Sequence, residues 1–154
     1  MKLTAKQAEC LKVIENLQFV DLTTIDKNGF PSTRAMLNLR NRQEYPHLTA
    51  LYEMEQNPLT VYLTTNTSSE KFTEIQQNAK ASLYYCEANI FHGVLLQGNI
   101  EIVTDNELRQ KAWQKGWEIY YPSGDSDYTL LRFTPNKLKT YSNFSVEQEP
   151  ILTI

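Results

Sequence analysis

Residues 19–39 read FVDLTTIDKNGFPSTRAMLNL, and this stretch carries the strongest fold signal in the chain. The segments 19–25 and 32–39 are rich in β-branched and apolar residues, which is typical of strands. Between them lies Asn28-Gly29, a dipeptide that favours the tight turn of a hairpin. Residues 19–39 are therefore predicted to form a β-hairpin.

The second strand of this hairpin is predicted to have two different faces, because side chains alternate along a strand. One face would be formed by Thr33, Ala35, Leu37 and Leu39. The other face would be formed by Arg34, Met36, Asn38 and Arg40. With two arginines and no acid, this second face is expected to be basic.

Helices and further strands are predicted on both sides of the hairpin. Capping boxes at positions 4 and 7, 67 and 70, and 104 and 107 predict helices over residues 4–17, from about 68 to 79, and from 104 to about 117. Apolar and β-branched runs predict strands at residues 59–65, 81–87, 92–103, 128–133 and 138–141. Six or seven strands joined by hairpins and short helices indicate the α+β class, with an antiparallel sheet that closes or nearly closes into a barrel.

The composition restricts the class of protein. A length of 154 residues suits one domain, which is expected to span residues 1–154. Fifteen Lys and Arg against eighteen Asp and Glu give a net charge of −3, which argues against a nucleic-acid partner. The chain has no apolar run of the ~18 residues that span a bilayer and no secretory signal at its start, so no membrane partner and a cytoplasmic location are expected. Cys10 and Cys86 are expected to be reduced core thiols.

The stretch 64–71, TTNTSSEK, is a candidate phosphate-binding loop. A strand is expected to run directly into a helix here, and the free N–H groups and dipole of a helix start attract an anion. Ser69 and Lys71 would add a hydroxyl and a cation, and Arg34 could hold a phosphate by two parallel hydrogen bonds. The alternative is an ordinary capped loop and a solvated arginine, with Glu70 repelling any anion.

Other candidate chemistries follow from the aromatic residues, the histidines and Gln97. A flat ring could stack on an aromatic side chain, or these side chains could simply form core: Trp113, Trp117, Tyr120, Tyr121 and Tyr141. Gln97 could hydrogen-bond the edge of a ring or face water. His47 and His92 have no neighbours at metal-ligand spacing, so no metal site is expected. No motif of a triad hydrolase or a nucleoside triphosphatase is present, and no catalytic residue is identified.

Four segments in order carry a family resemblance: 29–36 (GFPSTRAM), 65–71 with 74–78 (TNTSSEK and EIQQN), 96–101 (LQGNIE), and 120–135 followed by 138–141 (LKTY). In these segments the chain resembles the pyridoxamine 5′-phosphate oxidase-like FMN-binding split barrels, in the branch of general stress proteins and nitroimidazole-reductase-like proteins. The resemblance covers about residues 19–143. It implies a six- to seven-stranded antiparallel split β-barrel with short flanking helices, and a homodimer with two FMN sites at the subunit interface.

The resemblance also implies roles for individual residues. Arg34 and Lys71 would hold the FMN phosphate with help from Ser69. The ring system and the ribityl chain would be contacted by Thr65 and by the backbone around Ala35 and Met36. Two further residues would contact the ring, namely Gln97, on a strand that often faces the flavin from the partner subunit, and Tyr141, which stands where the oxidases proper carry a tryptophan.

The chain departs from the oxidases proper in three places. Glu70 stands where they have a second phosphate-binding arginine, and Leu39 stands where they have a lysine. The segment 144–149 lacks the Arg and His motif that grips their substrate phosphate. We therefore expect an FMN-dependent oxidoreductase that does not oxidise vitamin B6 phosphates and that uses a small-molecule electron donor and acceptor. The alternatives are a cofactor-free stress or interaction protein that keeps the fold, a nitroimidazole-type reductase, or a split barrel that binds haem or a deazaflavin.

Overall fold

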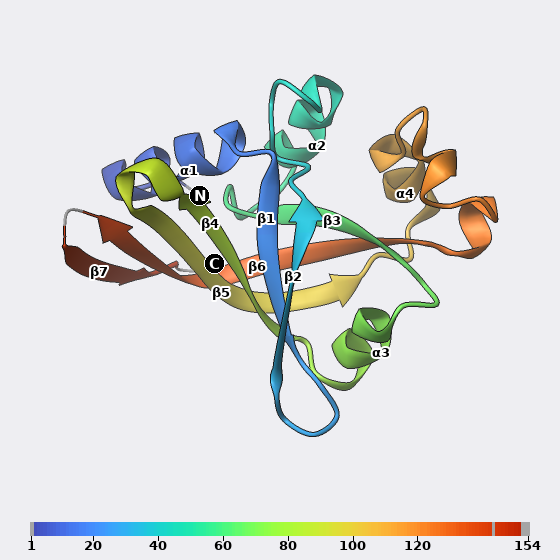
Figure 1. Cartoon of the computed structure of the whole chain (residues 1–154). Coiled ribbons are helices and arrows are strands. Elements are labelled where there is room, and N and C mark those ends of the chain that lie inside the picture. The colour runs from blue at the N-terminus through green and yellow to red at the C-terminus, as the bar shows by residue number, and fades with distance from the viewer. Residues whose placement is uncertain (1, 143, 152–154) are drawn as a thin grey trace.

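The structure is a computed structural model that describes residues 2–142 and 144–151, so the ends of the expected domain and position 143, where the resemblance ends, lie outside the described residues. Its seven strands form one antiparallel sheet in the order β2-β1-β4-β5-β6-β3, with β7 paired to β6 (Figure 1). The strands are β1 Phe19–Ile25, β2 Pro31–Leu37, β3 Val61–Asn66, β4 Lys80–Glu87, β5 His92–Ile102, β6 Tyr128–Ser142 and β7 Ser145–Pro150.

Short helices lie around this sheet: α1 Ala5–Asn16, α2 Thr49–Glu53, α3 Glu70–Gln77 and α4 Asn106–Ala112. The sheet curls until β2 and β3, the two ends of the strand order, come into contact without pairing in the described residues (Figure 1). The predicted α+β class and antiparallel split barrel with short flanking helices are therefore confirmed.

The core lies on the inner face of the curled sheet. One row of directly opposed residues crosses four neighbouring strands and is completely buried: Leu22, Leu83, Leu96 and Leu138. Each buried leucine contributes about 1.5–3 kcal/mol relative to an exposed one. Helix α1 covers this core through Cys10 and Ile14, and burial raises the pKa of the Cys10 thiol to about 11. Cys86, expected in the core, is exposed instead.

The hairpin of β1 and β2 has the predicted turn, and Phe19 pairs with Leu37 at its open end. The strand β2 ends at Leu37, so the prediction that Asn38 and Arg40 extend a basic face is wrong. Both side chains are buried and turned inward to satisfy backbone carbonyls. Arg40 donates from Nη1 to the Thr60 carbonyl oxygen at 2.8 Å, and Asn38 donates from Nδ2 to the Leu17 carbonyl oxygen at 2.7 Å. Buried polar groups require such partners, which is why these residues leave the strand.

The helix starts were predicted with mixed success. The Thr4–Gln7 capping box is present, with both reciprocal hydrogen bonds. The box predicted at Thr67 is absent, because the Thr67 hydroxyl bonds that of Thr129 at 2.7 Å and the N-cap of α3 is Ser69. The third predicted box, at positions 104 and 107, is also wrong. There the N-cap of α4 is Asp105, and this helix ends at Ala112 rather than near position 117.

The C-terminal strands differ from the prediction. Residues 128–142 form one strand, β6, where two were expected. Pro135 lies within it and has no N–H to donate, but the pairing with β5 shifts register between Gln97 and Gly98 and continues beyond the proline. The strand β7 was not predicted. It is attached to α1, where the Thr4 hydroxyl donates to Glu149 Oε1 at 2.9 Å and Lys6 pairs with Glu147.

Candidate functional site

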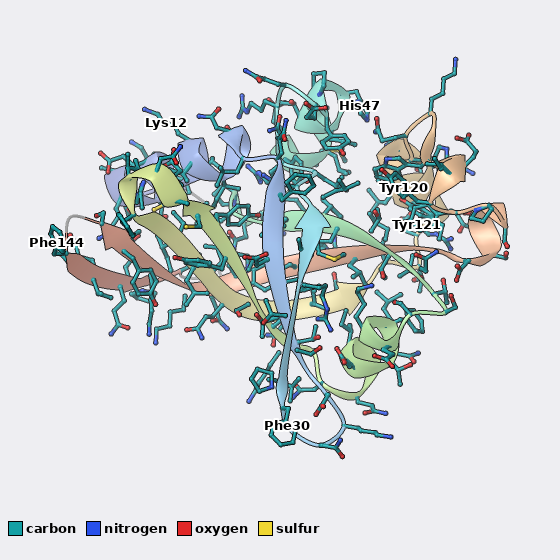
Figure 2. All side chains as sticks on the ribbon, viewed as in Figure 1. Lys12, Phe30, His47, Tyr120, Tyr121 and Phe144 are labelled. Atoms are coloured by element: carbon teal, nitrogen blue, oxygen red, sulfur yellow. The ribbon has the colours of Figure 1, made fainter. Side chains whose placement is uncertain are left out.

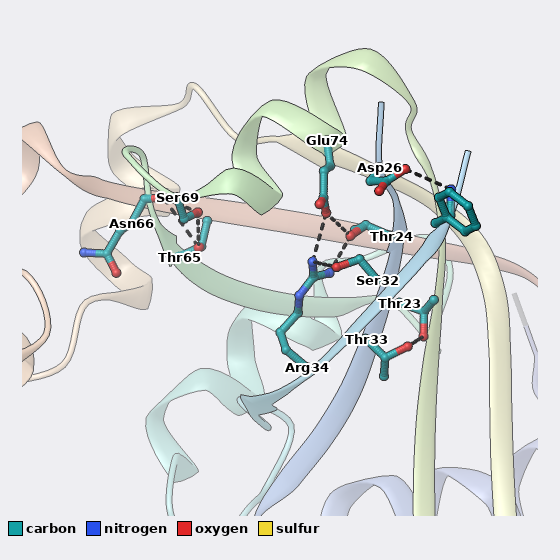
Figure 3. Close-up of polar contacts among 11 residues, drawn as sticks. Thr23, Thr24, Asp26, Ser32, Thr33, Arg34, Thr65, Asn66, Ser69 and Glu74 are labelled. Carbon is teal, nitrogen blue, oxygen red and sulfur yellow. Dashed lines mark hydrogen bonds and ion pairs between the residues drawn. The ribbon is translucent and has the colours of Figure 1, made fainter. Parts of the chain in front are cut away.

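Arg34 lies on β2 and extends from the hairpin toward α3 (Figure 3). Its Nη2 donates to Ser32 Oγ at 2.8 Å and to Glu74 Oε2 at 2.9 Å. Its Nη1 donates to the Thr24 hydroxyl, which in turn donates to Glu74. The exposed fractions are only 22% for the Arg34 side chain and 11% for that of Glu74, so this ion pair is largely withdrawn from water.

The loop from β3 to α3 brings two hydroxyls together at the start of the helix that carries Glu74 (Figure 3). The Oγ1 atom of Thr65 and the Oγ atom of Ser69 are 3.0 Å apart, and the Ser69 hydroxyl donates to the Asn66 carbonyl oxygen at 2.7 Å. Ser69 is the N-cap residue, yet its side chain accepts no hydrogen bond from the first turn of α3. The start of α3 therefore has no side-chain cap, contrary to the capped-loop alternative, and its backbone N–H groups could bind an anion.

Lys71, in the first turn of α3, belongs to the same group of charges. Burial lowers the pKa of its ammonium group, the positive charge of Arg34 lowers it further, and Glu74 raises it. Two cations and one carboxylate from β2 and α3 are therefore close enough to influence one another. We call Arg34, Lys71, Ser69 and Thr65 the cradle.

Asp127 holds the loop of the cradle in place from the start of β6. Its Oδ1 accepts the Ser68 N–H at 2.8 Å, its Oδ2 accepts from Asn66 Nδ2 at 2.8 Å, and its carbonyl oxygen accepts the Thr67 N–H at 2.8 Å. Hydrogen bonds from Asn66 and Ser68 lower the pKa of the Asp127 carboxyl. No role was predicted for this residue, and no local signal identifies one.

Glu74 is the other residue that the sequence did not reveal. The expectation singled out Glu70 as the carboxylate opposing an anion, but the carboxylate that pairs with Arg34 is Glu74. Glu70 and Glu74 both line a hollow of about 360 Å³ between the turn of the hairpin and α3. Helical spacing places Glu74 on the same face as Lys71, three residues earlier, but it does not place Glu74 beside Arg34.

The side chains of three expected contact residues lie on the outer face of the sheet, opposite to the side chain of Arg34, although the contact expected of Ala35 is through its backbone. The cross-strand register places Gln97 beside Ser82 and Lys137, in the same row as Thr33. Ala35 and Tyr141 share this outer face, where the Tyr141 ring lies edge-on to Tyr84 at 6.2 Å between centroids. The structure thus separates Ala35, Gln97 and Tyr141 from the side chain of Arg34, which points inward with Met36.

The aromatic candidates near α4 form a second core. Trp113 lies 5.0 Å from Tyr128 and 5.8 Å from Tyr121, between ring centroids, and Trp117 packs against the same rings. Tyr120 differs from them, since 55% of it is exposed and its carbonyl oxygen accepts from Asn66 Nδ2 at 3.1 Å (Figure 2). Leu39, the residue in place of a lysine, is also buried in this second core.

Two further properties concern the described residues only. Residues 2–142 and 144–151 contain no group of three or more His, Cys, Asp or Glu side chains that could hold a metal ion. None of the helices in those ranges is long and apolar enough to cross a membrane.

Comparison with known proteins places this geometry in a family. A sequence model described as "Pyridoxamine 5'-phosphate oxidase" matches residues 7–142. A pyridoxine/pyridoxamine 5′-phosphate oxidase of Allorhizobium ampelinum is 32% identical over 88 residues, which is 57% of this chain but 35% of that enzyme. The matched part thus spans about a third of the enzyme.

Solved structures agree with this match. A Clostridium acetobutylicum protein related to general stress protein 26, of the pyridoxinephosphate oxidase family, has a TM-score of 0.74 and 31% identity, and the match covers 94% of this chain and 93% of that one. A pyridoxamine 5′-phosphate oxidase-related, FMN-binding protein of Nostoc punctiforme shares the fold, with a TM-score of 0.63, 15% identity and coverage of 99% and 100%. The split barrel, the matched residues 7–142 and the general stress protein relative together establish that the chain belongs to the pyridoxamine 5′-phosphate oxidase family.

Proposed function

We propose that this protein binds FMN and that the cradle holds the FMN phosphate. The observation that carries the proposal is that the Arg34 side chain reaches Glu74 on α3, a helix whose first turn has no side-chain cap and contains Lys71. Two cations held close together repel, and a phosphate between them would relieve that repulsion. A fold neighbour that is an FMN-binding protein supports the choice of ligand.

The residues of this chain would bind and orient the flavin. A bound flavin would supply hydride or electron transfer, so no side chain needs to act as an acid or a base. The Ser69 hydroxyl and the first N–H groups of α3 would hydrogen-bond the phosphate, while Thr65 and the backbone at Ala35 and Met36 would contact the ribityl chain and the ring. The buried row of leucines, which begins at Leu22 directly opposite Arg34, would keep this arrangement rigid.

A homodimer is part of the proposal, because Gln97 and Tyr141 lie on the outer face and the cradle opens elsewhere. These side chains can contact a flavin in the cradle only if a second copy of the chain brings its outer face against the first. Half-buried apolar side chains on that face, Tyr84 and Leu95, suit such contact. The remaining partners would be a small-molecule electron donor and acceptor in the cytoplasm, without nucleic acid or membrane.

The substrate is proposed to differ from vitamin B6 phosphates. The segment that would have to grip a substrate phosphate forms β7, and its charged residues are Glu147 and Glu149. Both carboxylates are directed to α1 by Lys6 and Thr4. A phosphate ester would meet negative charge there, so neither pyridoxine nor pyridoxamine phosphate should be oxidised.

The direct test is the absorption spectrum of the purified protein and of the small molecule that it releases on denaturation. We expect a yellow protein that releases FMN, or that binds added FMN when purified without it. A Soret band or a deazaflavin spectrum would replace FMN with haem or a deazaflavin. Absence of binding to any of the three would favour the cofactor-free alternative, which has one observation on its side, namely that Arg34 is already paired with Glu74.

A further inference from the structure

Glu74 is the group next to the cradle that opposes an anion. Its residue is 9% exposed, and its carboxylate accepts hydrogen bonds from Arg34 and from the Thr24 hydroxyl. It therefore occupies the position on Arg34 that a phosphate oxygen would take. A carboxylate and a phosphate bind a guanidinium group through the same kind of charge-assisted hydrogen bond, so the two groups compete.

The hydrogen-bond donors of Arg34 show how far Glu74 limits that residue. A guanidinium group has five N–H donors in a fixed fork. Both donors of Nη2 are engaged, by Ser32 and Glu74, and Nη1 donates once to Thr24. In the described part of the chain, Nε and one hydrogen of Nη1 remain without an acceptor. A phosphate must bind one of these two donors with Glu74 alongside it, or must displace Glu74 from Arg34.

The charges lead to the same conclusion. Arg34 and Lys71 supply two positive charges, and Glu74 cancels one of them. A phosphate monoester carries a charge of about −1.5 to −2 at neutral pH. The net positive charge that Arg34, Lys71 and Glu74 leave therefore does not neutralise the phosphate. Because the ion pair is largely withdrawn from water, solvent screens this mismatch less than at an open surface.

We propose that Glu74 is an internal competitor for Arg34 that limits the affinity of the cradle for a phosphate monoester. In the free protein it keeps the guanidinium group oriented between the hairpin and α3. When a phosphate binds, Glu74 has to share or release Arg34. This inference rests on the proposed FMN phosphate site, and it names the residue that sets the affinity of that site.

The test compares wild type with Glu74→Gln, which removes the charge but keeps an acceptor for Thr24. The ligands are FMN, riboflavin, which has the same ring without a phosphate, and inorganic phosphate, with affinities from flavin fluorescence and calorimetry. We expect FMN to bind about tenfold more tightly to Glu74→Gln, which corresponds to about 1.4 kcal/mol. Riboflavin affinity should change less than twofold, and adding Arg34→Ala should abolish the gain.

Glu101→Gln is the matched control, because Glu101 also pairs with an arginine, Arg132, but on β5 and β6 rather than on β2 and α3. It should leave FMN affinity within twofold of wild type. Should Glu74→Gln fold poorly, Glu74→Asp provides a second variant. Its shorter side chain withdraws from Arg34 while keeping its charge, so it should give a smaller gain of the same sign.

The outcomes separate this inference from the proposed function. FMN binding by wild type that is not tightened in Glu74→Gln or Glu74→Asp, or an equal gain for riboflavin, overturns the inference and leaves the FMN proposal standing. Failure of both proteins to bind FMN, together with an Arg34-dependent gain in inorganic phosphate binding by Glu74→Gln, overturns the FMN proposal and supports the inference. Binding of neither ligand to either protein overturns both.

Discussion

Lys71 adds charge to the cradle but takes no part in the hydrogen bonds that join Arg34 to Glu74, so we expect the fold to tolerate its loss. Lys71→Ala is expected to weaken FMN binding about 10- to 100-fold, because a hydrogen bond to a charged group contributes about 1.5–3 kcal/mol. Its thermal stability should stay close to that of wild type. Flavin titration and a melting curve of the same sample check both statements.

Arg34→Ala should weaken FMN binding to a similar degree and should also reduce stability. It leaves the carboxylate of Glu74 largely buried with the Thr24 hydroxyl as its remaining hydrogen-bond donor in the described part of the chain, which costs about 1–3 kcal/mol. Comparison of the melting curves of Arg34→Ala and Lys71→Ala isolates this cost. Unchanged FMN affinity in both variants, with a wild type that binds FMN well, would mean that the phosphate lies elsewhere.

The protonation of Lys71 makes FMN binding dependent on pH. Burial and Arg34 lower the pKa of its ammonium group from the ordinary value of 10.5. An anion prefers the protonated form, so FMN affinity should fall as pH rises through this lowered pKa, at a pH below 10.5. Riboflavin is the control for titration of the ring itself, and Lys71→Arg should remove the decline. A pH profile identical for FMN and riboflavin would argue against a contact between Lys71 and the phosphate.

Among the strands, β5 has two buried glycines that differ in what a side chain would meet. A Cβ atom at Gly98 would lie 2.7 Å from the Pro135 Cα atom, in the backbone of β6 where the register shifts. The nearest neighbours of a Cβ atom at Gly93 would be atoms of the Tyr84 side chain, with its hydroxyl oxygen closest and a ring carbon at 2.8 Å. Gly98→Ala is expected to lower the free energy of unfolding by about 1–3 kcal/mol. Gly93→Ala should lower the free energy of unfolding by less, because the Tyr84 side chain can turn away whereas the backbone of β6 cannot. Equal losses of unfolding free energy in denaturant titrations of the two variants would contradict this account.

The loop before α3 depends on the carboxylate of Asp127. The pKa of the Asp127 carboxyl is lowered in the folded protein. Its carboxylate therefore contributes fully to the free energy of unfolding above the ordinary pKa of 3.8, and this contribution is lost as pH falls through the lower folded value. Asp127→Asn replaces one accepting oxygen by a donor facing Asn66, so this variant should bind FMN less tightly at neutral pH and lose less stability on acidification. Asp125→Asn is the control, because Asp125 lies two residues before Asp127 and its side chain is 80% exposed. Equal FMN affinity in the two variants would exclude a positioning role for Asp127.

The proposed dimer places the outer face of one chain over the cradle of another. Leu95 lies in the middle of that face, in a row with Tyr84 and Lys139. Leu95→Glu should therefore shift the protein from dimer to monomer at micromolar concentration and weaken FMN binding with it. Ile119→Glu, at an apolar residue that is 79% exposed beside α4, should leave the dimer intact. Light scattering in the presence of FMN is the measurement, and a wild-type monomer that binds FMN fully would refute the shared site.

Sequence patterns of short range account for much of the molecule. The Asn28-Gly29 turn, the Thr4 capping box and the apolar alternation of the strands are local signals, and the structure has all three. They suffice for an α+β antiparallel barrel, because each depends on neighbours within one turn or one hairpin. Arg34, Ser69 and Lys71 were also named as phosphate contacts from the type of residue and the strand-to-helix spacing, and this assignment stays a prediction.

Pairings between distant residues determine the rest of the site. Arg34 bonds to Glu74, which lies 40 positions away in the sequence, and Ser68 bonds to Asp127, which lies 59 positions away. No local sequence pattern could predict either contact. The strand β6 continues through Pro135 because β5 can shift its register there, which the isolated segment does not reveal. The opposite placement of Gln97 and Arg34 likewise follows from the register across the sheet. Burial and charge act through space, so which carboxylate opposes the proposed phosphate became visible only in the folded chain.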